Sequence, residues 1–197
     1  SGTRSDALPL RLGPCVWERG TEDAFVRALT SPRVVRGVRV LPHGWDASTV
    51  LREAARVPNA CALIDAGGLV TGLTNDACAR ELMGALRASG QAKRGCVYLR
   101  SGDDRKMVDM GDGDGGGNGN GSGDDVPLES TTLDPGSRFT FFDQVHTTGT
   151  DVPQPASGCA LLTLSKDVDL RDVAQAAWRM RGLGVGQELV LLLPPSV

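Results

Sequence analysis

Two polar segments near the carboxyl end of the chain carry the side chains best suited to chemistry. The first is His146-Thr-Thr-Gly-Thr-Asp151, and the second is Gln175-Ala-Ala-Trp-Arg-Met-Arg-Gly182. A guanidinium group is planar, permanently charged and able to bind two oxygens of one phosphate. Hydroxyl groups donate hydrogen bonds to the same oxygens. Arginines in one segment and threonines in the other are therefore suited to holding phosphate groups.

The elements around these segments follow an α/β pattern. Strands are expected over 61–65, 95–99, 138–143, 159–164 and 189–193, a further edge strand over 105–110, and helices over 74–88 and 169–180. The short, continuously apolar runs are typical of strands buried on both faces of a parallel sheet. Functional loops gather at the carboxyl ends of such strands. We therefore expect the two polar segments to open onto a common edge of one sheet.

The chain divides into two parts at the sequence level. Residues 1–60 form an N-terminal extension of uncertain, mixed structure, with short helices near 21–29 and 46–56 and a strand near 34–40. Residues 61–197 carry the α/β pattern. Within them, the run at 111–125 is acidic and rich in glycine, a composition that predicts a disordered insert.

The order of elements and motifs resembles the C-terminal RecA-like lobe of superfamily 2 helicases, and of SecA-type translocases in particular. Their motif V is similar to Thr148-Gly-Thr-Asp-Val152, and the Gln and Arg of their motif VI are similar to Gln175 and Arg179. The family's second motif VI arginine falls on Gly182 here, and the nearest guanidinium is that of Arg181. The resemblance covers about residues 61–193. It implies a three-layer RecA-like lobe with a mostly parallel sheet.

The resemblance also implies a function. In the family, nucleotide lies between two lobes, and a guanidinium of the second lobe stabilises charge on the transferred phosphoryl group. The implied partner is an upstream RecA-like lobe, and ATP with Mg²⁺ is expected only when both lobes are present. The roles carried over are catalytic for Arg179 and Arg181, nucleotide-binding for Gly149, Asp151 and Gln175, and polymer-binding for Thr147 and Thr148. The polymer track is either nucleic acid or polypeptide.

The chain is more closely similar to a group of very large eukaryotic proteins. They carry runs like Phe142-Asp-Gln-Val-His-Thr-Thr-Gly-Thr-Asp151 and the segment that ends at Gly182. Members of the group are often labelled ubiquitin thioesterases or ubiquitinyl hydrolases. This resemblance implies a piece of a larger protein, with ubiquitin as a further candidate partner. The alternative function is then that of a non-catalytic interaction module in a cysteine-type deubiquitinase.

Composition limits the remaining classes. The 197 residues have a net charge of −3, which argues against a strongly basic, autonomous nucleic-acid-binding domain. Five cysteines form no CxxC pair, and several lie in apolar runs, so we expect reduced, buried thiols in an intracellular (cytoplasmic or nuclear) protein. No apolar run approaches the roughly 20 residues that span a bilayer, and no metal site or membrane partner is expected.

Several of these residues have simpler explanations that stay open. Arg179 and Arg181 suit the negative end of a helix dipole, where they would be solvated or paired. His146 is either a base or a turn residue bonded to the backbone. Asp65 is expected to cap the loop that follows it, and Trp178 to pack on the sheet or on a neighbouring domain. A cysteine hydrolase would need a thiolate beside His146, and Cys159, at the start of an apolar strand, is a poor candidate.

Overall fold

A computed structural model of the chain describes residues 20–110, 125–147 and 149–197. They form one sheet of eight strands in the order β1-β8-β7-β2-β6-β3-β4-β5. The strands are β1 (Val35–Val40), β2 (Ala60–Ile64), β3 (Gly95–Leu99), β4 (Lys106–Asp109), β5 (Val126–Pro127), β6 (Arg138–Phe142), β7 (Gly158–Thr163) and β8 (Gln187–Leu193). The helices are α1 (Thr21–Thr30), α2 (Ala47–Ala55), α3 (Asn75–Ala88) and α4 (Leu170–Ala177), with the 3₁₀ turns η2 (Leu128–Ser130), η3 (Pro135–Ser137) and η4 (Val145–Thr147).

The sheet is mostly parallel. Strands β1, β8, β7, β2, β6 and β3 run in one direction, and only β4 and β5 are antiparallel to their neighbours. Every residue of β2, β3, β6 and β7 is buried, as continuous apolar runs predict for strands covered on both faces. The expected α/β class with a mostly parallel sheet is therefore confirmed.

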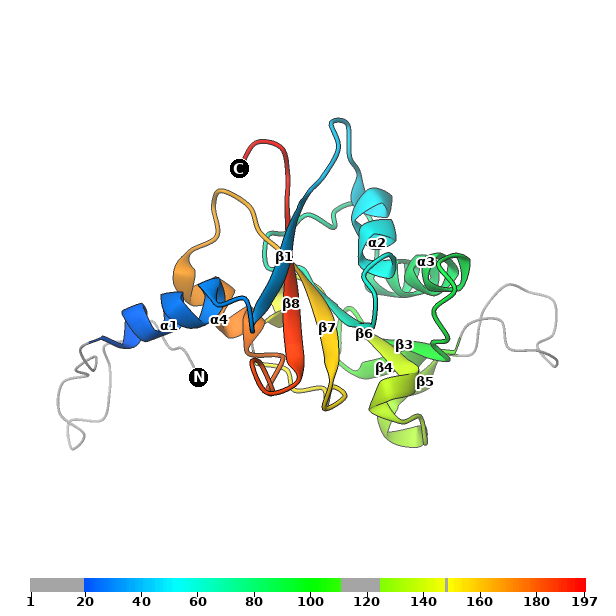
Figure 1. The fold of residues 1–197 in the computed structure, drawn as a ribbon. Helices are drawn as coiled ribbons and strands as arrows, with labels where there is room; N and C mark the ends of the chain where they lie inside the picture. The colour runs from blue at the N-terminus through cyan, green and yellow to red at the C-terminus, as the bar shows by residue number, and fades with distance from the viewer. Residues whose placement is uncertain (1–19, 111–124, 148) are drawn as a thin grey trace, which may run out of the picture.

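Helices cover both faces of the sheet (Figure 1). On one face, α2 and α3 pack over a core cluster that contains Leu51, Leu82 and Phe141. On the other face, the end of α4 packs over a second cluster, and Leu29 of α1 packs against it. Residues 35–55, which the sequence interpretation left in an extension of uncertain structure, contribute β1 to the sheet and α2 to its face. The chain from β1 onward thus belongs to one layered unit.

Two predicted elements differ from expectation in the structure, one in its position in the sheet and one in its length. The expected edge strand, β4, is flanked on its outer side by the short β5, so β4 is not an edge. Helix α4 ends at Ala177, three residues before the predicted end at Met180. The amides of Arg179 and Met180 bond to the carbonyls three residues before them, which tightens the last turn of the helix.

Some predicted features lie outside the described residues. These are the glycine-rich insert up to residue 124 and Thr148 of the first polar segment. Among the residues that are described, no helix has both the length and the apolar character needed to cross a membrane.

Candidate functional site

The connection between β6 and β7 is the structural centre of the candidate site. These strands lie on either side of β2, so the connection from β6 to β7 must cross over β2. Residues 149–157, here named the crossing segment, do so without forming a helix or strand. Pro153 and Pro155 have no N–H to donate, so this stretch cannot make a regular ladder. Val152 is buried in the core cluster beneath α4, which places the segment on the α4 face.

Side chains from distant elements bind the carbonyl oxygens of the crossing segment. Buried carbonyls need partners, and an irregular extended stretch provides none of its own. Four of the five donor side chains come from outside the segment. The donors and acceptors are Arg179 to Thr150, Lys106 to Asp151 (2.6 Å), Gln154 to Val152 (3.1 Å), Arg138 to Pro153 (3.1 Å) and Gln187 to Pro155 (2.6 Å). The path of the segment is therefore fixed by contacts to its main chain.

The structure brings Arg179 and Arg181 to the crossing segment. Arg179 donates to the Thr150 carbonyl and, at 3.4 Å, to that of Gln175. Arg181 pairs loosely with Asp151, at 3.5 Å, and its side chain is 54% exposed. Burial and the neighbouring Arg181 lower the pKa of Arg179, and Asp151 opposes this shift. The two polar segments thus meet where the crossing segment packs beside the end of α4.

The other predicted site residues have distinct environments. Thr147 is buried, and its hydroxyl donates to the Gln144 carbonyl at 3.0 Å. Gly149 has a φ of +74°, a left-handed conformation that favours glycine at this bend. Gln175 is half-buried on α4. The contacts therefore join Arg179, Arg181 and Asp151, while Thr147 is committed to local structure.

His146 lies between two carboxylates that come from different parts of the fold. Its Nδ1 atom contacts Asp143, and its Nε2 atom lies 3.1 Å from Asp104 in the turn between β3 and β4. Asp143 also accepts a hydrogen bond from the side chain of Asn75, at the start of α3 (3.1 Å). Burial disfavours the charged imidazole, but the hydrogen bonds to Asp143 and Asp104 outweigh it and raise the pKa of His146 above 6.5. His146 is thus more than a turn residue bonded to backbone.

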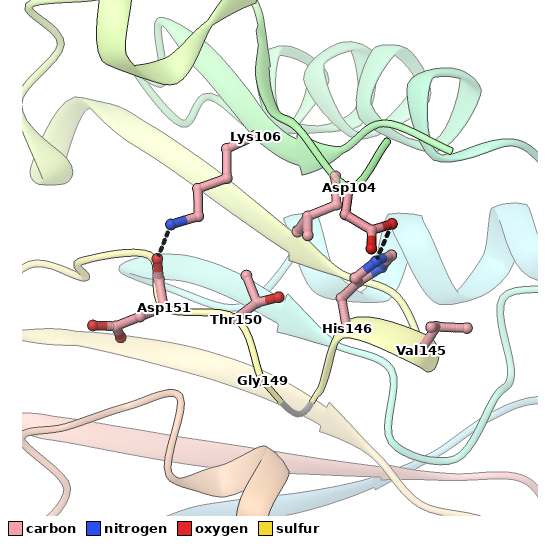
Figure 2. A pocket seen from close by; sticks show the side chains of 8 residues that line it. Asp104, Lys106, Val145, His146, Gly149, Thr150 and Asp151 are labelled. Carbon is pink, nitrogen blue, oxygen red and sulfur yellow. Dashed lines mark hydrogen bonds and ion pairs between the residues drawn. The ribbon is translucent and has the colours of Figure 1, made fainter. Parts of the chain in front are cut away.

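A pocket of about 450 Å³ opens beside His146 (Figure 2). The turn between β3 and β4 forms one wall with Asp104 and Lys106, and Val145, His146 and residues 149–151 form the other. Neither Asp104 nor Lys106 was predicted from the sequence. The only sequence signal there is a run of charged residues in a turn, and nothing in it points to a loop 45 residues further on.

Replacing His146 by glutamine is expected to lower stability in a pH-dependent way. Its pKa is higher in the folded chain, so the stabilisation is fully present below pH 6.5 and is lost as pH rises through the folded pKa. We expect a loss of about 1.5–3 kcal/mol at pH 5.5, the range for hydrogen bonds to charged groups, and a smaller loss at pH 9. Urea unfolding measures both values. His43→Gln, on the exposed β1–α2 loop, is the control, and equal losses at both pH values would contradict the prediction.

Gln187 is a structural residue that the sequence interpretation missed. At the start of β8 it is 4% exposed, donates to the Pro155 carbonyl at 2.6 Å and accepts from the Gly182 amide at 2.7 Å. Gln187→Leu leaves both groups without a partner and is expected to lower the free energy of unfolding by about 2–3 kcal/mol. Glu188→Gln, at the half-buried neighbour that pairs with Arg36 on the surface, should cost less than about 1 kcal/mol. Urea denaturation at pH 7 compares the two variants, and similar losses would assign Gln187 no special role.

Asp65 closes the carboxyl edge at the centre of the sheet. It is 1% exposed and accepts hydrogen bonds from the amides of Leu69 (2.8 Å) and Val70 (2.9 Å) and from the Thr163 hydroxyl (2.6 Å). Burial raises the pKa of its carboxyl although these donors favour the charged form. The expected role as a cap for the following loop is confirmed. Gly67 belongs to the same closure, since a Cβ there would lie 2.8 Å from the Leu164 carbonyl carbon.

The cysteines offer no activated nucleophile within the described residues. Burial raises the pKa of Cys61 and Cys78 to about 12, and it also raises the pKa of Cys96 and Cys159. A thiol with a raised pKa is a weak nucleophile at neutral pH. Cys159 is the second residue of β7, at the amino edge of the sheet, whereas His146 follows the carboxyl end of β6. Cys15 lies outside the described residues.

Trp178, expected to pack on the sheet or on a neighbouring domain, is 52% exposed. It borders an apolar groove of about 360 Å³ between α1 and the end of α4, lined by Ala24, Ala28, Leu29, Val34, Ala177 and Leu183.

Comparisons of the chain with models of protein families, with curated proteins and with solved structures gave no match.

Proposed function

We propose that residues 61–193 form the second RecA-like lobe of a helicase-type nucleotide hydrolase. In this proposal, the crossing segment and the guanidinium groups of Arg179 and Arg181 face a nucleotide held against an upstream lobe. The observation that carries the proposal is the bond from Arg179 to the Thr150 carbonyl, together with the pair of Arg181 and Asp151. These contacts join the residues that are similar to motifs V and VI.

The two arginines differ in how freely they can reach a phosphate. Arg179 is committed to the main chain, so it holds the crossing segment against the end of α4. Arg181 is more than half exposed, and a surface pair of this kind contributes only about 0–1 kcal/mol. Its guanidinium can therefore exchange Asp151 for phosphate oxygens at little cost. Both cations fit a site for a triphosphate, with Gly149, Asp151 and Gln175 beside them.

Nucleotide binding requires a second lobe in this proposal. None of the three lysines (Lys93, Lys106 and Lys166) follows a glycine and precedes a Ser or Thr, as the lysine of a phosphate-binding loop does. ATP with Mg²⁺, when bound, supplies the phosphoryl group that is transferred and neutralises part of its charge. The residues of this chain would stabilise the remaining charge and exclude water. Of the two threonines predicted to contact a polymer, Thr147 has a buried side chain that bonds within its own turn, and Thr148 lies outside the described residues. The side chain of Thr150, which was not predicted to have this role, borders the pocket.

The second candidate function is a non-catalytic interaction module within a ubiquitinyl hydrolase. The buried thiols and the apolar groove beside Trp178 favour it. The two functions predict different behaviour of Arg179. In a nucleotide hydrolase, Arg179 is needed for ATP turnover, whereas in a non-catalytic interaction module it matters only for folding.

The test is ATP hydrolysis by the protein that contains both lobes. Wild type is compared with Arg179→Ala, with and without a single-stranded oligonucleotide or an unfolded polypeptide as the track. We expect turnover to be lost in the variant, with a loss of stability of about 1 kcal/mol from the missing hydrogen bond to the Thr150 carbonyl. Turnover equal to that of wild type would remove the motor assignment and leave the interaction module.

A further inference from the structure

We propose that the pocket beside His146 binds a phosphate group, and that the Asp104 carboxylate takes the place of this phosphate until it is displaced. The pocket lies between the β3–β4 turn and residues 145–146 and 149–151 (Figure 2). Phosphate binding itself does not depend on the proposed function. Assigning that phosphate to the backbone of a polymer track does rest on it.

His146 and the residues that hold it form the rigid side of the pocket, and they are positioned to bind an anion. Asp143 holds Nδ1 of His146, and Asn75 holds Asp143 while also donating to the Leu99 carbonyl at 2.8 Å. The side chains of His146 and Asp143 are only 12% and 20% exposed. This chain of contacts fixes the imidazole ring with Nε2 directed at the pocket. When the imidazole is protonated, a state favoured by the carboxylates that raise the pKa of His146, Nε2 donates a charge-assisted hydrogen bond into the pocket.

Asp104, on the solvent-exposed side of the pocket, is only weakly held in place. Asp104 is the group that accepts from Nε2, at 3.1 Å, and its side chain is 75% exposed. Its backbone has a φ of +52°, a left-handed conformation that aspartate adopts more readily than most residues other than glycine. An exposed ion pair contributes little to stability, so another anion can replace this carboxylate. Asp104 therefore marks where an anionic oxygen sits in the pocket.

The facing wall supplies the remaining donors. The Lys106 ammonium reaches the Asp151 carbonyl at 2.6 Å and has two further N–H groups to donate. The Thr150 side chain rises between Lys106 and His146 (Figure 2). The carboxylate of Asp151, the remaining acidic group of the lining, points away from the pocket toward Arg181. Once Asp104 moves aside, an ammonium, an imidazolium and a hydroxyl converge on one anion, which suits a tetrahedral phosphate.

The experiment uses the two histidines of the chain as NMR reporters. Inorganic phosphate, and separately a single-stranded oligonucleotide without terminal phosphates, are titrated into the 197-residue protein. The imidazole Cε1–H signal of His146 should shift with at least one ligand, while that of His43 stays unchanged. A response to the oligonucleotide alone identifies a polymer phosphate, and a response to inorganic phosphate identifies a free one. No shift of His146 with either ligand overturns the proposal.

Variants separate displacement of Asp104 from general charge effects. Asp104→Asn should tighten phosphate binding about two- to fivefold, the range for loss of an exposed competing pair. Asp103→Asn removes the same charge from a neighbour that pairs with Arg100, and it should leave the affinity unchanged. Lys106→Gln should weaken binding about tenfold. Asp104→Gly, which suits the positive φ, repeats the first test without the carboxamide. Equal effects of Asp104→Asn and Asp103→Asn would overturn the displacement mechanism.

Discussion

Turnover of ATP by the two-lobe protein should fall about 10³-fold when Arg179 is replaced by lysine, the lower end of the range for loss of an arginine that stabilises a transferred phosphoryl group. Lysine keeps the positive charge but loses the planar fork, so it cannot hold the Thr150 carbonyl and phosphate oxygens together. The free energy of unfolding should change by less than about 1 kcal/mol, because a lysine can still reach a carbonyl on a partly exposed surface. Steady-state hydrolysis and urea unfolding provide the two measurements.

Arg80→Lys is the matched control for this experiment. Arg80 lies on α3, on the opposite face of the sheet, and pairs with Asp76 in the same helix. Its replacement should leave both turnover and stability unchanged. If Arg179→Lys and Arg80→Lys gave the same turnover, the guanidinium of Arg179 would have only its structural contact to the crossing segment.

Asp65→Ala should destabilise the fold more than any other single substitution considered above, by about 3–4 kcal/mol. The alanine leaves the amides of Leu69 and Val70 and the Thr163 hydroxyl without their acceptor in a buried place. Each lost partner costs on the order of 1–3 kcal/mol, and the losses do not add in full. Urea unfolding at pH 7 is the measurement.

Asp65→Asn and Asp167→Ala make this prediction specific. The asparagine keeps one acceptor oxygen and the shape of the side chain, so its cost should be clearly smaller than that of alanine. Asp167 lies exposed in the loop after β7, and its replacement should change stability by less than about 0.5 kcal/mol. A loss for Asp65→Ala as small as that for Asp167→Ala would show that the three hydrogen bonds contribute nothing net.

Local patterns are strong enough to predict most elements of this fold. The continuous apolar run at 61–64 and its equivalents in β3 and β7 leave few alternatives to buried parallel strands. Helix α3 follows from its helical apolar spacing and is found within one residue of the predicted bounds. The place of β1 beside β8 was not predicted, since pairing between residues about 150 positions apart has no local signal.

The candidate site could be predicted only in part. The two polar segments stand out by their residue types, and the structure joins Arg179 of one to Thr150 of the other. The carboxylate beyond His146 and the ammonium beside Asp151 come from the β3–β4 turn, whose distance in space from the loop depends on the whole sheet. Thr147 shows the converse case, because its hydroxyl suited a ligand by type but is used within its own turn.

The path of the crossing segment is specified mainly by groups outside it. Its backbone geometry therefore depends little on the identity of most of its own side chains. Side chains of this segment that make no contact of their own can vary during evolution, unlike those of Val152, which is buried, and Gln154, which donates to Thr140 and to the Val152 carbonyl. The carbonyls keep the same partners whichever side chains stand beside them. Length has no such freedom. One inserted residue would move every later carbonyl away from its donor, so homologues should tolerate exchanges here far better than insertions or deletions.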